Sequence, residues 1–424
     1  MLWNLKVWAG ARHGTILDHE EIKKGGLSQE RLAGWKGRLG MDFELPPEEK
    51  RLQEETRTFV DREIRPLVSD IEKGRSYPIE IVRRMGRQGI YRLLVPKEYG
   101  GVYETVRSLP ICVAREELSR GHNFAGSSIA THGLGSYPLV LAGCSEMRNR
   151  FLPKIASGEI IPAFALTEPE AGSDAGSLRT SALREGDHYR VNGKKCFISN
   201  AGMANYIVLF AKTDPSLGTK GISAIIVETG TAGYEVSRNM EILAIEVVNE
   251  LKFKDCLVPR KNLLGEEGKG FSIAMQTLDL LRCSVGAHAV GTAQEAFDLA
   301  LNYAKKRVQF GKPIAQHQAI QLKLANMVVE VTCARLLVYQ AALAKDKGQP
   351  DVTFKSSMAK YYATEMAQRV VDQAVQIHGG YGVLVGAFPL ERLYREVRAP
   401  RIYEGTSEIQ QMIIANHFIR EKKK

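Results

Sequence analysis

The stretch Leu166–Asp174, with the sequence LTEPEAGSD, marks the point at which the chain changes from helical to strand-like sequence. Its small and hydroxyl-bearing residues can present backbone N–H groups and side-chain donors to an electron-rich ligand. A turn between two domains also favours proline and glycine, so the stretch taken alone predicts only a turn. A ligand-binding role for it therefore depends on support from elsewhere in the chain.

An antiparallel β module of about 100 residues is predicted after this stretch. Tyr189–Val191 and Lys194–Asn200 flank Asn192-Gly193, which predicts a hairpin because Asn-Gly readily adopts the positive φ angles of a type I′ turn. Two further apolar runs, Tyr206–Lys212 and Ile222–Glu228, have the length and composition of strands. Gly, Asp and Pro turns join these runs in place of long helices, which favours a separate β domain.

Helices are predicted on both sides of the β module. Before it, Pro46-Pro47-Glu48-Glu49 suits a first helical turn. After it, apolar residues recur every three or four positions at 285–304 and again at 324–341, which predicts a helical bundle. Gly348-Gln349-Pro350 and Gly379-Gly380 predict the ends of two of these helices. The whole pattern predicts a mainly α protein with an inserted antiparallel β domain.

Composition and charge limit the class of protein. With 424 residues, 44% hydrophobic and 25% charged, the chain fits a soluble globular protein and not a disordered or collagen-like one. Roughly 100 to 200 residues per domain would give several domains. Lysine and arginine outnumber the acidic residues by 58 to 48, and the net charge of +10 favours an anionic partner such as nucleic acid, acidic lipid or a phosphorylated cofactor.

The cysteines, the apolar runs and the N-terminal residues indicate the kind of cellular compartment and whether the chain crosses a membrane. The six cysteines are scattered without a Cys-x-x-Cys pair, which indicates a reducing compartment and neither a disulfide framework nor a zinc site, and we expect no metal. The apolar runs are far shorter than the roughly 20 residues that cross a bilayer, so we expect no membrane span. Residues 1–40 contain several acidic residues and match a leader sequence poorly, so they are treated as an extension of unknown role.

A second stretch, Ile402–Gln410 with the sequence IYEGTSEIQ, also has the features of a site. It places the carboxylate of Glu404 in an apolar and glycine-containing setting just before a predicted helix. Thr406 or Ser407 suits the N-cap of that helix. The alternative role of Glu404 is a carboxylate that interacts only with the helix macrodipole.

Together these two stretches resemble the signatures of the acyl-CoA dehydrogenase family. Three further segments resemble the family in the same order along the chain, namely Asn262–Phe271, Arg307–Ile314 and Gln376–Gly382. The resemblance covers about residues 41–420. It implies an N-terminal α-helical domain (41–162), a middle β-barrel-like domain (163–272) and a C-terminal four-helix bundle domain (273–424). It also implies FAD bound non-covalently between the subunits of a homotetramer or homodimer.

The resemblance further implies a set of FAD-binding residues. The flavin would be lined by Phe164, Leu166, Thr167, Gly172 and Ser173, with Phe197 and Ser199 on the opposite side of its ring. The pyrophosphate and adenosine would be held by Arg307, Phe310, Gln376 and Gly380 of a neighbouring subunit, and Thr406 and Glu408 would touch the cofactor near the base. An arginine fork suits phosphate oxygens, and glycines permit close backbone approach. Ordinary structural roles compete: a solvated cation for Arg307, β-core positions for the two phenylalanines, and a helix stop for Gly379-Gly380.

Glu404 is implied to be the catalytic base. In this chemistry a carboxylate removes the α-proton of an acyl-CoA thioester while flavin N5 takes the β-hydride, and an apolar cleft raises the proton affinity of the base. Leu281 stands where another branch of the family carries its base, and leucine cannot accept a proton. The residues implied to bind substrate are Ser173, Asp279, Arg282, Tyr403 and Gly405. An intrahelical Asp279–Arg282 pair is the alternative for those two residues.

The sequence departs from the family pattern at several positions. Ala244–Val248 stands where many relatives carry a different turn, Phe197 replaces a frequent tryptophan, and Val383–Pro389 is slightly longer than the usual loop. Ala125 lies near the position at which glutaryl-specific members carry an arginine, so a dicarboxylic substrate is less expected than a monocarboxylic one.

The predicted function is FAD-dependent α,β-dehydrogenation of an acyl-CoA thioester to the 2-enoyl-CoA, with electrons passed to an electron-transfer flavoprotein. The alternatives are an acyl-CoA oxidase that uses oxygen, a basic flavoprotein of the same fold that binds nucleic acid, and a purely structural helical protein. Nucleic acid is the less favoured partner, because the basic residues are dispersed and their only sharp cluster is Lys422–Lys424. The predicted location is the cytoplasm, or the mitochondrial matrix in a eukaryote.

Overall fold

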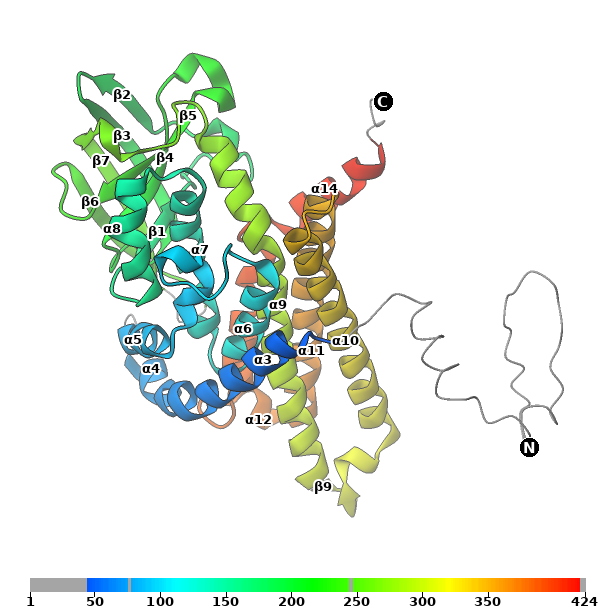
Figure 1. The fold of residues 1–424 in the computed structure, drawn as a ribbon. Helices are drawn as coiled ribbons and strands as arrows, with labels where there is room; N and C mark the ends of the chain where they lie inside the picture. Colours follow the sequence, from blue (N-terminus) through cyan, green and yellow to red (C-terminus); the bar gives the residue numbers. More distant parts are fainter. Residues whose placement is uncertain (1–43, 75–77, 244–246, 420–424) are drawn as a thin grey trace, which may run out of the picture. The chain divides into compact units, whose positions relative to one another are not determined.

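The described chain runs through short helices, then a sheet, then long helices (Figure 1). The computed structural model describes residues 44–74, 78–243 and 247–419. The predicted extension at residues 1–40 lies outside these ranges, and so do residues 244–246 of the unusual segment Ala244–Val248. The predicted placement of a β domain between two helical regions is confirmed. The domain boundaries given above remain a prediction.

The N-terminal region consists of helices around an apolar core. Its α-helices are α3 (Pro47–Phe59), α4 (Val68–Gly74), α5 (Ile79–Gln88), α6 (Ser108–Gly121), α7 (Asn123–Ala142) and α8 (Ser145–Ala156), with shorter helical turns at Val60–Ile64, Arg65–Leu67, Ile90–Leu94 and Lys97–Tyr99. α3 begins as predicted, with Pro46 as its N-cap and Glu48 and Glu49 in its first turn. α6 differs from a surface helix because nearly all of its residues are buried, including the charged Arg115.

The middle region is a sheet. Its strands are β1 (Pro162–Ala165), β2 (Ser181–Glu185), β3 (His188–Ser199), β4 (Tyr206–Lys212), β5 (Ile222–Glu228), β6 (Tyr234–Glu241), β7 (Val247–Pro259) and β8 (Leu263–Leu264), with short helical turns at Ala175–Ser177, Pro215–Gly221 and Arg260–Asn262. The strand order is β6-β7-β3-β2-β4-β5-β8, and β1 pairs with β4. Most neighbours are antiparallel, as predicted, but β4 runs parallel to β1 and to the start of β2. β1 therefore brings the end of the N-terminal region into the sheet.

The predicted hairpin at Asn192-Gly193 is wrong. These residues lie inside the single strand β3, and the hairpin is formed earlier, where Glu185 pairs with His188. Gly193 has a φ of 150° and marks an irregularity in the register between β3 and β7. A Cβ on this glycine would lie 2.8 Å from the Cα of Thr180. The glycine therefore permits a close approach of two backbones and not a turn.

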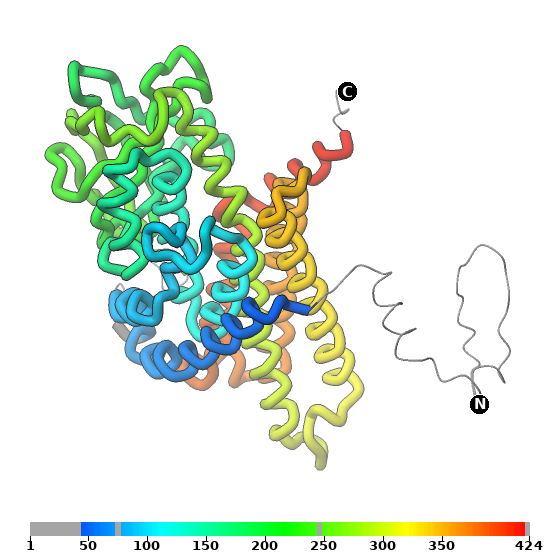
Figure 2. Tube along the Cα trace, in the orientation of Figure 1, coloured from blue at the N-terminus to red at the C-terminus, as the bar shows by residue number. Residues whose placement is uncertain are grey.

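The C-terminal region is a bundle of long helices. Its elements are α9 (Gly270–Lys306), β9 (Val308–Gln309), β10 (Lys312–Pro313), a helical turn at Ile314–Gln316, α10 (Gln318–Asp346), α11 (Val352–His378), α12 (Gly380–Val383), α13 (Leu390–Glu396), a helical turn at Ala399–Arg401, and α14 (Ser407–Ile419). α11 packs against α9, α10 and α14, and Figure 2 shows the yellow-green α9 running from the sheet towards the β9–β10 hairpin. The predicted helix ends are confirmed, since α10 stops at Asp346 and α11 at His378.

The second predicted apolar stripe lies on α10 and forms its buried side. Met327, Val331, Ala334 and Val338 are buried, as the spacing predicts. Among the described helices, α10 alone is long and apolar enough to cross a membrane, a property that core helices of bundles share. Another side of α10 also carries exposed apolar residues, namely Leu322, Val328, Val329 and Leu336. This surface is left uncovered by the single chain.

Candidate active site

Glu404 lies in a strained turn between the helical turn Ala399–Arg401 and α14. Its φ is 53° and that of Gly405 is 89°, so two consecutive residues adopt the left-handed conformation. A non-glycine residue in this region costs about 1–3 kcal/mol, so surrounding contacts must hold the turn. The Oε2 atom of Glu404 is inaccessible to solvent and has no hydrogen-bond partner among the described residues.

Two buried side chains hold this turn by its carbonyl oxygens. Nζ of Lys360, on α11, donates a hydrogen bond of 2.7 Å to the carbonyl oxygen of Gly405. Nε2 of Gln410, on α14, donates to the carbonyl oxygens of Glu404 and Gly405 at 3.2 and 3.1 Å. A Cβ at position 405 would lie 2.4 Å from Nε2 of Gln410. The two side chains, called the carbonyl clamp below, therefore fix the backbone of Glu404 and require glycine after it.

The neighbours of Glu404 are placed by the start of α14. Thr406, one of the two predicted candidates, is the N-cap, because its Oγ1 accepts a hydrogen bond of 3.3 Å from the backbone N–H of Ile409. Glu408 is exposed in the first turn, and its own N–H and the hydroxyl of Thr406 lower its pKa. Tyr403 is partly buried. Glu404, Thr406 and Glu408 thus lie together at one end of α14.

Burial and three cations set the proton affinity of Glu404. Burial raises the pKa of its carboxyl, while Arg115, Lys360 and Arg282 oppose that effect, in decreasing order. The net pKa lies above the ordinary value. Burial also lowers the pKa of Lys360 to about 8, although Glu404 acts in the other direction. A carboxyl with a raised pKa in a buried site is what proton abstraction near neutral pH requires.

Asp279 and Arg282 form the intrahelical ion pair that the sequence left open. Asp279 also accepts a hydrogen bond of 3.0 Å from Thr353 on α11. The guanidinium of Arg282 is nearly buried, and its Nε has no partner within the described ranges. Leu281, on the same helix, is buried in the core of the N-terminal helices, and a Cβ on Gly133 would lie 3.2 Å from both of its methyl groups. Position 281 thus carries a core side chain that cannot accept a proton, and the CoA contacts of Asp279 and Arg282 remain a prediction.

The stretch Leu166–Asp174 is held against β3 by a buried ion pair. Nζ of Lys195 lies 2.7 Å from Oε1 of Glu168 and donates to the carbonyl oxygen of residue 166 at 2.9 Å. Glu168 also accepts hydrogen bonds of 2.6 and 3.0 Å from the backbone N–H groups of residues 179 and 180. Burial raises the pKa of Glu168, but Lys195 and these N–H groups outweigh it, so the pKa lies below the ordinary value.

The predicted flavin-binding residues of the β domain lie beside this ion pair. The backbone N–H of Cys196 donates to the carbonyl oxygen of Thr167 at 3.0 Å, which joins the stretch to β3. Leu166 is buried, Phe164, Thr167 and Ser199 are partly buried, and Gly172, Ser173 and Phe197 are exposed. Phe197 has a φ of 56° and is 58% exposed, and a Cβ on Gly172 would meet open space. All of these residues except Leu166 are therefore at least partly accessible to solvent, and their contacts with a flavin remain a prediction.

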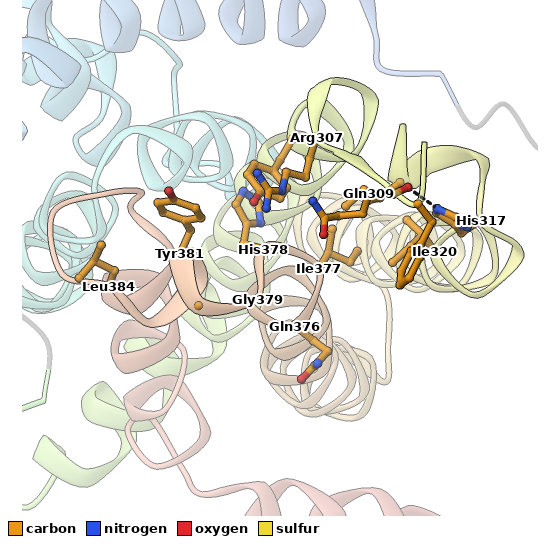
Figure 3. Close-up of a pocket in the computed structure, with 14 residues that line it drawn as sticks. Arg307, Gln309, His317, Ile320, Gln376, Ile377, His378, Gly379, Tyr381 and Leu384 are labelled. Atoms are coloured by element: carbon orange, nitrogen blue, oxygen red, sulfur yellow. Dashed lines mark hydrogen bonds between the residues drawn. The ribbon is translucent and has the colours of Figure 1, made fainter. Parts of the chain in front are cut away.

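The other predicted FAD residues lie around a cavity at the far end of α9 and α11 (Figure 3). The cavity has a volume of about 690 Å³, and Arg307, Phe310, Gln376 and Gly380 are among its lining residues. Nε2 of His317 lies 3.2 Å from the carbonyl oxygen of Gln309 beside it. A Cβ on Gly380 would meet nothing within 4 Å. An arginine can bind pyrophosphate oxygens, a phenylalanine ring can stack on an adenine, and open glycine backbone permits close approach, so these residues fit FAD.

The structure brings the predicted residues together in three groups and not in one. Lys360, beside the turn of Glu404, and Gln376, at the cavity, are 16 positions apart on α11, which corresponds to about 24 Å along the helix axis. Figure 1 likewise shows α14 and the β9 hairpin at opposite ends of the bundle. Phe310, at the hairpin, is 94% exposed. The assignment of this cavity to a cofactor of a neighbouring subunit remains a prediction.

Sequence reasoning missed Lys360, Gln410, Arg115 and the pair Glu168–Lys195. For Lys360 and Arg115 a signal was available in the sequence, because each is a charged residue at an apolar position of a helical stripe. Lys360 stands in line with the buried Ser356, Ala363 and Ala367 of α11. Such a residue must find a partner in the folded protein, because an unpaired buried charge is strongly destabilising.

Comparisons with known proteins agree with this geometry. Family models match residues 46–159 (acyl-CoA dehydrogenase, N-terminal domain), 163–256 (middle domain) and 268–419 (C-terminal domain). The acryloyl-CoA reductase (NADH) of Anaerotignum propionicum is 42% identical over 90% of this chain and 96% of its own length. Two solved structures cover 90% of this chain and 100% of their own chains. One is the butyryl-CoA dehydrogenase of Megasphaera elsdenii, with a TM-score of 0.86 and 37% identity. The other belongs to a structure described as the electron transferring flavoprotein of Acidaminococcus fermentans, with a TM-score of 0.87 and 38% identity.

The three models together span most of the described chain in the order that the sequence predicts. The solved relatives share its helix–sheet–helix architecture along their whole length. The chain therefore belongs to the acyl-CoA dehydrogenase family of FAD-dependent oxidoreductases.

Proposed function

We propose that this enzyme catalyses the α,β-dehydrogenation of an acyl-CoA thioester to the 2-enoyl-CoA, with Glu404 as the base that removes the α-proton. The observation that carries this proposal is the Oε2 atom of Glu404, which is inaccessible to solvent and lacks a hydrogen-bond partner among the described residues, in a carboxyl whose pKa burial raises. A carboxylate that only stabilised a helix end would be solvated or capped. The carbonyl clamp holds Glu404 in one orientation, as proton abstraction requires.

The residues around Glu404 exclude water and organise the substrate. We propose that Leu281 forms an apolar wall of the substrate site and that Tyr403, Gly405 and Ser173 contact the thioester. Asp279 and Arg282 would meet the CoA portion. The backbone N–H of Glu404 would stabilise the charge that develops on the thioester oxygen as the proton leaves.

FAD, when bound, supplies the acceptor for the β-hydride. Phe164, Leu166, Thr167, Gly172 and Ser173 would lie along the flavin, Phe197 and Ser199 would cover its other side, and Thr406 and Glu408 would approach it near the base. Arg307, Phe310, Gln376 and Gly380 of a second subunit would hold the pyrophosphate and adenosine. We therefore propose a homotetramer or homodimer in which each cofactor site is completed by a second copy. The exposed apolar residues of α10 and the hairpin support this assembly.

An electron-transfer flavoprotein is the proposed electron acceptor, and a relative with a TM-score of 0.87 comes from a structure described by that name. A second candidate is the reverse reaction, reduction of a 2-enoyl-CoA, which the 42% identity to an acryloyl-CoA reductase favours. Both directions use the same proton site at Glu404. We place the enzyme in the cytoplasm, or in the mitochondrial matrix if the source is a eukaryote.

The test is anaerobic titration of the yellow holoenzyme with butyryl-CoA and octanoyl-CoA, following the flavin absorbance. We expect wild type to bleach and Glu404→Gln to keep the yellow colour while losing about 10²–10⁴-fold in reduction rate. Glu146→Gln is the matched control, because Glu146 is an exposed carboxylate in the first turn of α8. Undiminished bleaching in the Glu404 variant would remove this residue from the mechanism.

The same preparations separate the remaining alternatives. Peroxide formed in air at the rate of acyl-CoA oxidation would identify an oxidase. Faster turnover of crotonyl-CoA with a reduced electron-transfer flavoprotein than of butyryl-CoA with an oxidised one would favour the reductase direction. Glu404→Gln should suppress both directions, because the proton that leaves Cα in one must be returned to it in the other.

A further inference from the structure

Glu365 of α11 binds both ends of the turn that carries Glu404. Its Oε1 accepts hydrogen bonds of 2.9 Å from Nε of Arg401 and 2.6 Å from Oγ of Ser407, and its Oε2 lies 2.8 Å from Nη2 of Arg401. Arg401 ends the helical turn Ala399–Arg401, and Ser407 begins α14. These two partners lie three positions before and three positions after Glu404. One carboxylate therefore closes the loop at whose midpoint the proposed base lies.

The hydroxyl groups of two adjacent residues at the start of α14 have different roles. Oγ1 of Thr406 accepts a hydrogen bond from the backbone N–H of Ile409 and caps the helix. Oγ of the buried Ser407 donates instead to Glu365 on another helix, and it also lies 3.5 Å from the carbonyl oxygen of Arg401. The helix keeps its cap without Ser407, so the contact with Glu365 serves the loop and not the helix end.

The contact between Arg401 and Glu365 is bidentate, because two nitrogens of one guanidinium meet the two oxygens of one carboxylate. This arrangement fixes the direction of both side chains as well as their distance. Burial raises the pKa of Glu365, but Arg401 and Ser407 outweigh that effect, so its pKa lies below the ordinary value and the carboxyl is ionised at neutral pH. The two side chains are 31% and 21% exposed, and a pair this exposed adds little to stability.

α11 holds the loop at two levels. Glu365 holds its ends, and Lys360, five positions earlier on the helix, donates to the carbonyl oxygen of Gly405 in its middle. Glu404 and Gly405 both have left-handed φ angles, and a strained pair of this kind persists only when surrounding contacts determine it. The carbonyl clamp bonds to these two residues. Glu365 adds the contact that joins the residue entering the loop, Arg401, to the residue leaving it.

We propose that Glu365 is a positioning residue for Glu404, because it closes this loop and so fixes the direction from which the base approaches the α-carbon of the substrate. This inference rests on the proposed function, since it concerns the base of the same reaction. Glu365 acts through the loop and not on the substrate, because its two oxygens are engaged by Arg401 and Ser407. A displacement of about 1 Å at a catalytic group can cost about 100-fold in rate. Loss of the closing contact should therefore slow proton abstraction more than it lowers stability.

The test is stopped-flow reduction of the holoenzyme flavin by butyryl-CoA under anaerobic conditions. The amplitude of bleaching gives the fraction of competent enzyme, and the dependence of the rate on concentration gives the limiting rate and the half-saturating concentration. We expect Glu365→Gln, which keeps the size of the side chain but removes its charge, to lower the limiting rate about 10–100-fold. The amplitude, the half-saturating concentration, the FAD content and the urea midpoint should stay close to wild type.

A kinetic isotope effect identifies the step that becomes slow. The probe is butyryl-CoA with deuterium in place of both α-hydrogens, because Glu404 removes one of these as a proton. If Glu365 positions the base, the isotope effect on the limiting rate in Glu365→Gln should be at least as large as in wild type. A role in stability alone would lower the amplitude and leave the rate of the intact enzyme unchanged.

The two ends of the loop can also be released separately. Arg401→Met and Ser407→Ala should each slow reduction, and adding either change to Glu365→Gln should lower the rate little further, because all of them break one contact. Arg401→Lys, which restores a charge, should recover part of the rate lost in Arg401→Met. The matched control is Glu330→Gln, which breaks a 2.9 Å ion pair with Arg369 between α10 and α11 and should keep the wild-type rate.

The outcomes distinguish this inference from the proposed function. Wild-type limiting rates in Glu365→Gln and Arg401→Met would overturn the positioning role while the dehydrogenase proposal stands. A loss confined to the amplitude, the FAD content or the urea midpoint would do the same, and so would a lowered rate without an isotope effect. If neither butyryl-CoA nor octanoyl-CoA reduces the wild-type flavin, the proposed function fails, and this inference fails with it.

Discussion

Lys360 Nζ donates a hydrogen bond of 2.7 Å to the carbonyl oxygen of Gly405, so a buried side chain of α11 holds the turn that presents Glu404. Lys360→Met removes this donor and leaves Gln410 as the remaining half of the carbonyl clamp. We expect the rate of flavin reduction by acyl-CoA to fall about 100-fold, because small displacements of a catalytic group cost this much. Stopped-flow measurement of flavin absorbance under anaerobic conditions gives the rate.

The matched control for this variant is Lys355→Met, on the same helix. Lys355 donates to Oε1 of Gln349 and does not contact the turn. We expect it to retain the wild-type rate, and both variants to retain FAD. A wild-type reduction rate in Lys360→Met would contradict the role of the carbonyl clamp.

The pH dependence of flavin reduction should follow the carboxyl of Glu404. Its pKa is raised above the ordinary 4.5 by burial, against the effects of Arg115, Lys360 and Arg282. Only the ionised carboxylate accepts a proton, so the rate should be low in acid and rise with pH, with a midpoint above 4.5. Removing a cation weakens the opposing effect, so Arg115→Met should move this midpoint to higher pH. Reduction rates measured with saturating acyl-CoA across pH 5–9 would show both effects. A midpoint that moves to lower pH in the variant would contradict this electrostatic account.

Much of the fold could be predicted because its signals are local. The start of α3, the end of α10 near Gly348 and the N-cap at Thr406 each depend on a few neighbouring residues whose conformational preferences are strong. At Asn192-Gly193 a strong local preference gave the wrong prediction. Its local preference is a turn, but pairing of β3 with β2 and β7 on both sides extends the strand through it.

The chemistry of the site could be predicted only in part, because it depends on contacts between distant segments. Glu404 could be identified from the sequence because its stretch resembles a family signature and because its neighbours are apolar residues and a glycine. The sequence could not place Lys360 against this turn, because α11 and the turn meet only in the folded chain. A charged residue on an apolar stripe does indicate a buried partner, but not which one. That partner is decided by helix packing, which has no local signature.

The buried pair Glu168–Lys195 should contribute strongly to the stability of the β domain. Lys195→Met would leave the carboxylate of Glu168 buried with only backbone N–H donors. Breaking one side of such a pair costs about 3–5 kcal/mol. We expect a decrease of this size in the free energy of unfolding at pH 7, measured by urea denaturation and circular dichroism.

The double variant Glu168→Gln/Lys195→Met tests the cause of that loss. It removes both charges, so it should be more stable than Lys195→Met alone, since no uncompensated carboxylate remains. The stretch Leu166–Asp174 should then keep its place beside β3, and FAD retention should recover with stability. Equal stability of the single and double variants would mean that the ion pair itself is not the stabilising contact.

Phe310 at the tip of the β9–β10 hairpin should act at a neighbouring subunit. It is 94% exposed at a φ of 52°, and Val308, two residues before it, is also exposed. An aromatic residue held in a strained and exposed position is typical of an interface anchor, and loss of such an anchor costs 2 kcal/mol or more, or about 30-fold in affinity. Phe310→Asp should therefore lower the oligomeric mass in light scattering and weaken FAD binding about 30-fold. The helices should be unaffected in circular dichroism, because the side chain makes little contact with its own bundle. Leu183→Asp, which changes an exposed leucine of β2, should leave mass and FAD affinity unchanged. If Phe310→Asp keeps both the assembly and the cofactor, the cavity at Arg307 serves its own chain and not a second copy.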